Sequence, residues 1–110
     1  MPAPPLPLLQ GSLDLLVLGV LSAGATHGYG VATTVRERSA GALQVEDAAL
    51  YQALHRLERR GLVEAEWGLS DNNRRARFYK LTTDGRKRLR ADAANWRRYA
   101  LAVSAVLEGA

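Results

Sequence analysis

The sequence predicts a mostly α-helical fold of the α+β class, in which a small domain of helices and one β-hairpin precedes a long C-terminal helix. Three observations support this prediction. Apolar residues recur at helical spacing in four segments, and two short alternating segments flank a turn-rich stretch. Residues 82–110 keep a single apolar seam. At 110 residues the chain is long enough for one domain.

The first predicted helix begins at Ser12, whose side chain is expected to cap it, and Asp14 in its first turn suits the positive end of the helix dipole. The helix carries one apolar stripe, and Leu15 and Leu18 make its opposite side apolar as well. A helix that is apolar all round is buried on more than one side. In so small a domain we expect a second subunit to supply one of the covering surfaces.

Two further helices and a short strand are expected before the hairpin. One helix opens at His27-Gly28-Tyr29-Gly30, with the histidine fixing its start, and reaches about Ser39. The segment Leu43-Gln44-Val45 alternates and is short enough for a single small strand. The next helix is amphipathic, covers residues 48–60, and follows the acidic pair Glu46-Asp47.

Two alternating segments predict the hairpin. The first runs from Leu62 to Trp67, and the second runs from Arg75 to Leu81 and contains the β-favouring pair Phe78-Tyr79. The residues between them, 68–73, are rich in turn formers. We therefore expect two antiparallel strands with an exposed tip.

The final helix is predicted to be capped by Thr82-Thr83-Asp84. Its apolar positions are spaced by alternating steps of four and three residues, which is the repeat of a coiled-coil seam. Such a seam can face the domain's own core, but this helix extends beyond what the preceding domain can cover, which favours a dimer seam. The seam consists of Leu89, Ala93, Trp96, Ala100, Val103 and Leu107.

The resulting order of elements is helix, helix, short strand, helix, hairpin and helix, which is typical of a winged helix-turn-helix. In that fold the third helix enters the DNA major groove, and the hairpin, or wing, reaches the backbone or the neighbouring minor groove. We accordingly divide the chain into a flexible N-terminal lead (residues 1–7), a winged helix-turn-helix domain (8–81) and a C-terminal dimerisation helix (82–110).

The positive charge of the chain is concentrated in one block. The net charge is +4, but residues 72–90 carry eight Arg and Lys side chains against Asp84 alone, a net charge of +7. A concentrated positive block on an otherwise mildly acidic chain suggests an anionic partner. A solubilising surface explains a charge run equally well when the run is taken by itself.

The outward face of the third helix and the tip of the hairpin carry the side chains expected to contact double-stranded DNA. A glutamine such as Gln52 can pair bidentately with adenine, and arginine favours guanine, phosphate or a narrow minor groove. A solvated helix face with a partly buried Tyr51 explains the helix equally well. The charge block, the hairpin and the helix order together favour DNA binding. The predicted contacts are Tyr51, Gln52, His55, Arg56, Arg59, Asn73, Arg74, Arg75 and Arg77.

Short motifs occur along nearly the whole chain from Leu8 onward. They are Gly11-Ser12-Leu13-Asp14-Leu15-Leu16, His27-Gly28-Tyr29, Leu50-Tyr51, Ala53-Leu54-His55-Arg56-Leu57-Glu58, Gly61-Leu62, Asn73-Arg74-Arg75-Ala76-Arg77-Phe78-Tyr79 and Leu81-Thr82. With these motifs the sequence resembles the PadR family of transcriptional regulators, in particular its short subgroup with a single C-terminal dimerisation helix. The resemblance implies a homodimer that binds palindromic operator DNA, usually as a repressor, and responds to flat, apolar or phenolic effectors.

The predicted recognition helix departs from the family pattern at two places. The family often has a small hydroxyl or glycine pair at the start of this helix and proline after the tyrosine, where this chain has Ala48-Ala49 and Gln52. Asp47 can cap the helix instead, but a carboxylate there repels a nearby phosphate. Gln52 replaces a rigid residue with one that can read a base, so we expect a different operator preference.

The resemblance also implies a place for an effector. In a dimer of this family, an aromatic residue on the last helix can border a cavity between subunits and stack on a flat ligand. The expected effector contacts are Trp96, Tyr99 and Leu15, and plain seam packing is the alternative role for Trp96. Trp67, at the first bend of the hairpin, is expected to pack over the wing.

No enzyme, metal or cofactor is predicted. The sequence has no cysteine, which excludes disulfides and sulfur-ligated metals and fits a cytoplasmic protein. His27 and His55 lie far apart without a carboxylate set for a metal, and no catalytic constellation is present. No signal peptide and no membrane-spanning stretch is expected. The alternatives to a DNA-binding regulator are a winged-helix module that binds protein and a dimer that sequesters an apolar ligand.

Overall fold

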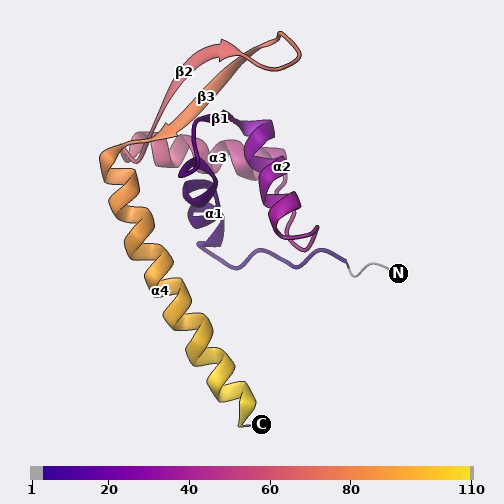
Figure 1. Cartoon of the computed structure of the whole chain (residues 1–110), viewed down its shortest axis with the longest axis vertical. Helices are drawn as coiled ribbons and strands as arrows, with labels where there is room; N and C mark the ends of the chain where they lie inside the picture. Colours follow the sequence, from indigo (N-terminus) through magenta and orange to yellow (C-terminus); the bar gives the residue numbers. More distant parts are fainter. Residues whose placement is uncertain (1–3, 110) are drawn as a thin grey trace.

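The computed structural model describes residues 4–109, which form four helices, a β-hairpin and a short third strand. Figure 1 shows the hairpin at one end of the molecule and the last helix leading away from it toward the other end. The predicted mostly helical winged helix-turn-helix with a long C-terminal helix is confirmed. In chain order the elements are α1 (Ser12–Leu21), β1 (Thr26–His27), α2 (Gly28–Arg38), α3 (Asp47–Arg59), β2 (Val63–Leu69), β3 (Arg75–Leu81) and α4 (Thr83–Glu108).

The core lies where the first three helices meet the base of the hairpin. Burial of apolar side chains is the main stabilising contribution to such a domain, and α3 supplies a regular set at steps of three and four residues, as its amphipathic pattern predicts. The hairpin adds Tyr79, which is 2% exposed. The largest fully buried aliphatic side chains are Val17, Leu18, Leu21, Val31, Leu50, Leu54, Leu57 and Val63.

The three-stranded antiparallel sheet has the order β1-β3-β2, so the long hairpin has one very short outer strand. In β2–β3, Trp67 pairs with Arg77 and Leu69 with Arg75, while Thr26 of β1 pairs with Tyr79. The first hairpin strand lies at Val63–Leu69, so it starts one residue later and ends two residues later than expected. The second strand has the predicted bounds.

The strand expected at Leu43-Gln44-Val45 is wrong, because this segment is a loop between α2 and α3. The Ser39 hydroxyl accepts a hydrogen bond from the Leu43 N–H (3.0 Å) and lies 3.4 Å from the Leu43 carbonyl oxygen. A side chain therefore occupies the backbone groups that a strand partner would need. The third strand is formed instead by Thr26–His27, directly before α2.

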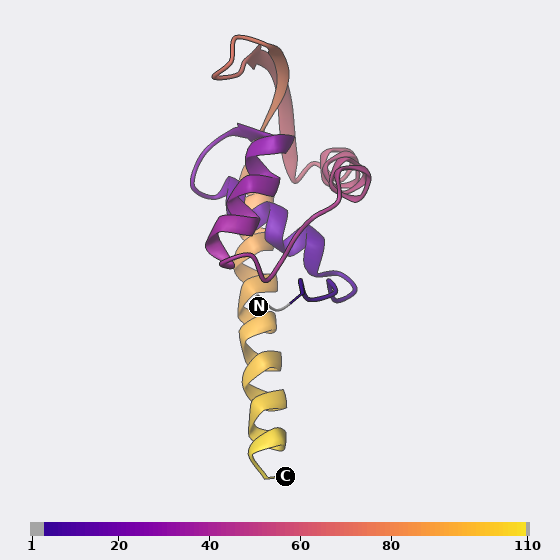
Figure 2. The same cartoon turned by 90° about the vertical axis from the view of Figure 1, so that its right-hand side faces the viewer.

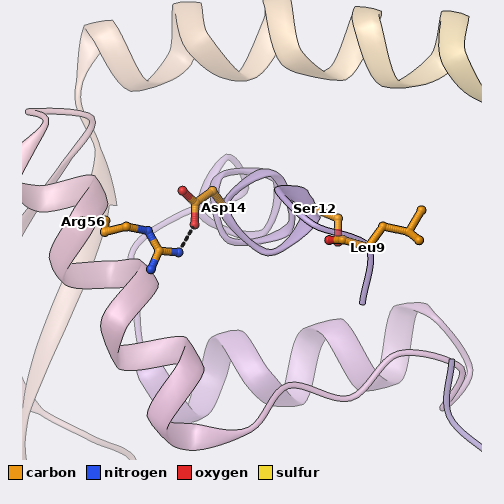
Figure 3. Close-up of polar contacts among 4 residues, drawn as sticks. All are labelled: Leu9, Ser12, Asp14 and Arg56. Carbon is orange, nitrogen blue, oxygen red and sulfur yellow. Dashed lines mark hydrogen bonds and ion pairs between the residues drawn. The ribbon is translucent and has the colours of Figure 1, made fainter. Parts of the chain in front are cut away.

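Two of the four predicted helix caps are present. His27 Nδ1 accepts from the Gly30 N–H at 3.0 Å, and Thr82 Oγ1 accepts from the Gly85 N–H at 3.0 Å, which fixes the starts of α2 and α4. The cap expected from Ser12 is wrong: Gly11, with φ of 83°, occupies the N-cap position of α1. The Ser12 hydroxyl instead donates to the Leu9 carbonyl at 2.6 Å (Figure 3).

The fourth expected cap, from Asp47, is also wrong. Asp47 is the first residue of α3, and Glu46 stands in the N-cap position. Within residues 4–109 the Glu46 side chain makes no capping hydrogen bond to α3. The carboxylate of Asp47 still lies in the first turn, where it interacts favourably with the helix dipole.

The long helix α4 lies against the domain only along its N-terminal half, where Leu89 packs against the core. Gly85 is its one buried residue within the described part of the chain, and both views show the C-terminal half of α4 extending past the other elements (Figures 1 and 2). No helix within residues 4–109 is both long and apolar enough to cross a membrane. Residues 1–3 of the predicted flexible lead lie outside the described residues; further along this lead, the Leu6 N–H donates to the Ala42 carbonyl at 2.8 Å.

Candidate nucleic-acid interface

A hollow of about 810 Å³ separates the wing from α3 and the start of α2. Its walls come from three separate parts of the chain, and it collects five of the nine side chains predicted to contact DNA. Predicted contacts that line it are Tyr51, His55, Arg74, Arg75 and Arg77. Of the remaining four, Gln52, Arg56 and Arg59 lie on exposed positions of α3 and Asn73 lies at the wing tip, outside the walls of this hollow.

The helix α3 divides cleanly into a buried and an exposed face. Its leucines point into the core, whereas Tyr51, Gln52 and His55 are exposed, as predicted. Tyr51 is 47% exposed and lies against the start of α2, where a methyl group on Gly28 would come within 3.1 Å of the tyrosine ring. The absence of a side chain at Gly28 therefore lets the ring pack close to α2.

Arg56, also on α3, is held by an intramolecular ion pair. Its Nη2 donates to Oδ1 of Asp14 on α1 at 2.6 Å, and Figure 3 shows the guanidinium reaching across to that helix. The two side chains are 43% and 25% exposed. The positive charge of Arg56 is therefore partly compensated in the free protein, and its predicted contact with DNA stays a prediction.

Arg77, on β3, is held in the same way by α3. Its guanidinium donates to both carboxylate oxygens of Glu58, at 3.3 and 2.9 Å, and lies 5.8 Å from the centre of the Tyr79 ring. A bidentate arginine–carboxylate pair has a fixed geometry. This pair ties the wing to the outward side of α3, so Arg77 has a positioning role in the free protein.

The wing tip is a tight turn that presents Arg74. Asn73 has a φ of 63°, a left-handed conformation that asparagine tolerates better than most residues. The Asn73 N–H donates to the Ser70 carbonyl and the Ser70 N–H donates to the Arg74 carbonyl, both at 2.8 Å. Arg74 is exposed at this turn, and within residues 4–109 it makes no ion pair.

An apolar cavity of about 570 Å³ lies on another side of the domain, between the N-terminal segment, α1, the end of α2 and α4. Two of the three predicted effector contacts, Leu15 and Trp96, line it. Tyr99 does not: it borders a separate shallow hollow with Asn95 and Arg98, although its ring centre is 6.3 Å from that of Trp96.

The predicted dimer seam lies along α4 and is largely uncovered in the single chain. Leu89, Ala93 and Trp96 line the apolar cavity, with Trp96 42% exposed. Further along the helix, Val103 and Leu107 are 40% and 66% exposed. Ala100 has intermediate exposure.

Sequence reasoning missed the partners that hold the predicted arginines. Asp14 was assigned only to a helix start and Glu58 was given no partner, because the ion pairs they form join residues 42 and 19 positions apart. Trp67 was expected to pack over the wing, but it is 59% exposed and lies beneath Arg75.

Among residues 4–109, no three His, Cys, Asp or Glu side chains gather as a metal site requires.

The fold and this interface define a winged-helix protein of the DNA-binding type. A family model described as "Transcriptional regulator PadR-like family" matches residues 17–91. The chain therefore belongs to the PadR-like family of transcriptional regulators, and it is a regulator and not an enzyme, as the sequence predicted. A protein of Lysinibacillus sphaericus named "Uncharacterized protein X" is 26% identical over 103 residues, which are 93% of this chain and 94% of that protein.

Solved structures with the same architecture come from several bacteria. A PadR family transcription regulator from Clostridium difficile R20291 is 27% identical, has a TM-score of 0.77, and the match covers 88% of this chain and 99% of that one. A PadR family regulator from Eggerthella lenta is 28% identical with a TM-score of 0.75, over 90% and 84%. Bacillus subtilis PadR in complex with operator DNA shares the fold at 21% identity and a TM-score of 0.65, over 73% of this chain and 45% of that one.

Proposed function

We propose that the protein is a homodimeric, sequence-specific repressor that binds a palindromic operator through α3 and the wing and is released by a small apolar or aromatic effector. The observation that supports this most directly is the hollow between α3 and the wing, where Tyr51 and His55 face Arg74 and Arg75. A helix and a cationic ribbon on one side of a domain are the two elements that a winged helix presents to DNA.

The roles of the two parts of the interface differ. The wing arginines suit phosphates, which fix the position of the protein and supply much of its affinity without reading the sequence. Gln52 is exposed on α3 and is the side chain there best suited to recognise a base, because its amide pairs bidentately with adenine. Sequence preference is therefore assigned to α3, and general affinity is assigned to the wing.

The dimer rests on the exposed apolar surface of α4. A helix with side chains such as Val103 and Leu107 left in solvent is stabilised when a second apolar surface covers it. We assign residues 82–110 to dimerisation and 8–81 to DNA binding. A two-fold pair of such domains reads two half-sites about one helical turn, roughly 34–36 Å, apart.

An effector is assigned to the apolar cavity lined by Leu15 and Trp96. This cavity lies between α1 and α4, so a ligand there contacts both the DNA-binding domain and the proposed dimer helix. Such a ligand lowers the affinity for the operator only if it binds more tightly to a dimer in which the two DNA-binding domains are spaced so that they do not fit the half-sites. A protein that acts on operator DNA in this way is expected in the cytoplasm.

The experiment that tests the proposal is a fluorescence anisotropy titration of labelled DNA from upstream of the protein's own gene, with random DNA of equal length as control. The titration is repeated over a salt series, and sedimentation equilibrium gives the oligomeric state. We expect a dimer that binds the upstream DNA more tightly than the random DNA, with a steep loss of affinity as salt rises.

Other outcomes point to other functions. Equal binding to both DNAs leaves a non-specific binder or an operator elsewhere, and DNA from other promoters then separates the two. Absence of salt-sensitive binding to any DNA contradicts the proposal and favours a module that binds protein. Quenching of Trp96 fluorescence by apolar compounds without any effect on DNA affinity favours a dimer that sequesters ligand.

A further inference from the structure

Trp67 is an exposed aromatic residue on a charged wing, and packing does not explain it. Its side chain is 59% exposed, although tryptophan carries the largest apolar surface of any residue. It lies on the same face of the hairpin as Tyr79, whose ring is buried at the base of the wing. Further from the base, this face opens into the hollow next to α3, and Trp67 lines that hollow.

The Trp67 ring has one close charged neighbour. The guanidinium carbon of Arg75 lies 4.6 Å from the centre of the ring, within the range of a cation–π contact. Trp67 pairs directly with Arg77, so Arg75 is its diagonal neighbour, at a cross-strand distance that long side chains can span. The side chain of Arg75 is thus folded back over the ring and not extended into solvent.

The three wing arginines therefore have three different surroundings. Arg77 is compensated by Glu58, whereas Arg74 is exposed at the turn. Arg75 makes no ion pair within residues 4–109, and its guanidinium carbon lies over an uncharged aromatic ring. A guanidinium that lies over an aromatic ring keeps its full charge, so its N–H groups can still bind an anion.

We propose that Trp67 is a positioning residue for DNA binding, which holds the Arg75 guanidinium in the orientation that contacts a DNA phosphate. The role rests on the proposed function. A free arginine loses side-chain freedom when it binds a phosphate, and the ring restricts that freedom before DNA arrives. Trp67 thus strengthens a contact that it does not itself make, on all DNA sequences alike.

The contact between the two side chains is tested first in the absence of DNA. In NMR spectra of the full chain, the side-chain protons of Arg75 are expected to lie upfield of those of Arg74, because they sit over the indole ring. Trp67→Ala is expected to remove this shift, and Trp67→Phe is expected to keep part of it. Arg75 protons at ordinary positions in the unaltered chain would overturn the proposal.

DNA affinity is then measured for Trp67→Ala, Trp67→Phe, Arg75→Ala and the double variant Trp67→Ala/Arg75→Ala, each checked for unchanged thermal unfolding. Trp67→Ala is expected to weaken binding about two- to fivefold on specific and random DNA. The double variant is expected to bind as Arg75→Ala alone does, because Trp67 acts through Arg75. Trp67→Phe, which retains an aromatic face, is expected to recover most of the affinity.

The matched control is Leu69→Ala. Leu69 is 66% exposed and pairs directly with Arg75, so its loss removes apolar surface beside the arginine without removing the ring. Equal weakening by Leu69→Ala and Trp67→Ala, or additive losses in the double variant, would refute the role of Trp67 while leaving the proposed function standing. Absence of DNA binding by the unaltered protein would refute both.

Discussion

Asp14 of α1 and Arg56 of α3 are joined by an ion pair of 2.6 Å that ties the proposed recognition helix to the helix beneath it (Figure 3). The residues that follow Asp14 on α1, Leu15 and Leu16, line the apolar cavity on the other side of that helix. One helix thus contacts both the candidate effector site and α3. If a bound effector displaced α1, the distance between Asp14 and Arg56 would change, and this helix would then connect the two proposed sites.

The ion pair predicts that Arg56 contributes less to DNA affinity than an unpaired arginine does. Arg56→Ala is expected to weaken binding less than Arg74→Ala, because Asp14 already compensates the charge of Arg56. Asp14→Asn is expected to tighten binding to all sequences, since it removes a negative charge and frees the arginine. Anisotropy titrations of the three variants at low salt measure these differences.

Stability provides the control for these variants. A pair this exposed contributes about 0.2–1 kcal/mol, so Asp14→Asn should lower the free energy of unfolding by no more than that. Urea denaturation checks that the domain stays folded. If Arg56→Ala weakens DNA binding as much as Arg74→Ala, then Arg56 leaves Asp14 in the complex and binds DNA directly.

Removal of the wing arginines is expected to lower the affinity for DNA by an amount that does not depend on the DNA sequence. The double variant Arg74→Ala/Arg75→Ala is expected to bind specific and random DNA more weakly by the same factor. The slope of log affinity against log salt should flatten by about one unit for each lost phosphate contact. A loss confined to specific DNA would mean that these arginines read bases and not phosphates.

For Gln52 we expect an effect that depends on the DNA sequence, in contrast to the uniform loss of affinity expected for the wing arginines. Gln52→Ala is expected to change the preference among operator sequences by about 1–3 kcal/mol if the amide makes a good base contact, with little effect on the salt slope. Competition titrations with operators altered at single base pairs measure the preference. Equal weakening on every sequence would remove this role from Gln52 and leave it as a solvated residue.

The sequence was sufficient to predict features that depend on local spacing. The apolar positions Leu50, Leu54 and Leu57 identified α3 and its buried face, and Thr82 identified the start of α4 by its capping chemistry. Such signals depend on neighbours within four residues. For the same reason the outward position of Gln52 was predicted correctly.

Features that depend on contacts between distant segments could not be predicted. The strand at Thr26–His27 exists because β3 offers it a partner, whereas the alternating segment Leu43–Val45 has no strand partner and is tied to Ser39. Which arginine is compensated is likewise a matter of tertiary position. Arg56, Arg75 and Arg77 look alike in the sequence, yet an aspartate, a tryptophan and a glutamate hold them.

The start of α4 fixes the direction in which this helix leaves the domain, and in the proposed dimer that direction determines the distance between the two DNA-binding domains. A methyl group on Gly85 would lie 2.0 Å from the Leu62 carbonyl oxygen, a backbone atom that cannot rotate away. That carbonyl also accepts the Thr82 N–H at 3.1 Å, and the Thr82 hydroxyl donates to the Gly61 carbonyl at 2.7 Å. The helix therefore leaves the hairpin in a direction fixed by close backbone packing.

Gly85→Ala is accordingly expected to displace α4 from the base of the wing and to lower the free energy of unfolding by about 1–3 kcal/mol, as overpacking does. Thr83→Ala, at an exposed position in the same turn, is the control and should change it by no more than about 0.5 kcal/mol. In the proposed dimer, the displaced helix also changes the distance between the two recognition helices. Gly85→Ala should then prefer operators whose half-sites are spaced differently from those of the unaltered protein, which a set of operators with inserted or deleted central base pairs measures. Unchanged stability together with an unchanged preferred spacing would show that α4 can reorient freely at its base. The dimer seam alone would then set the distance between the two recognition helices.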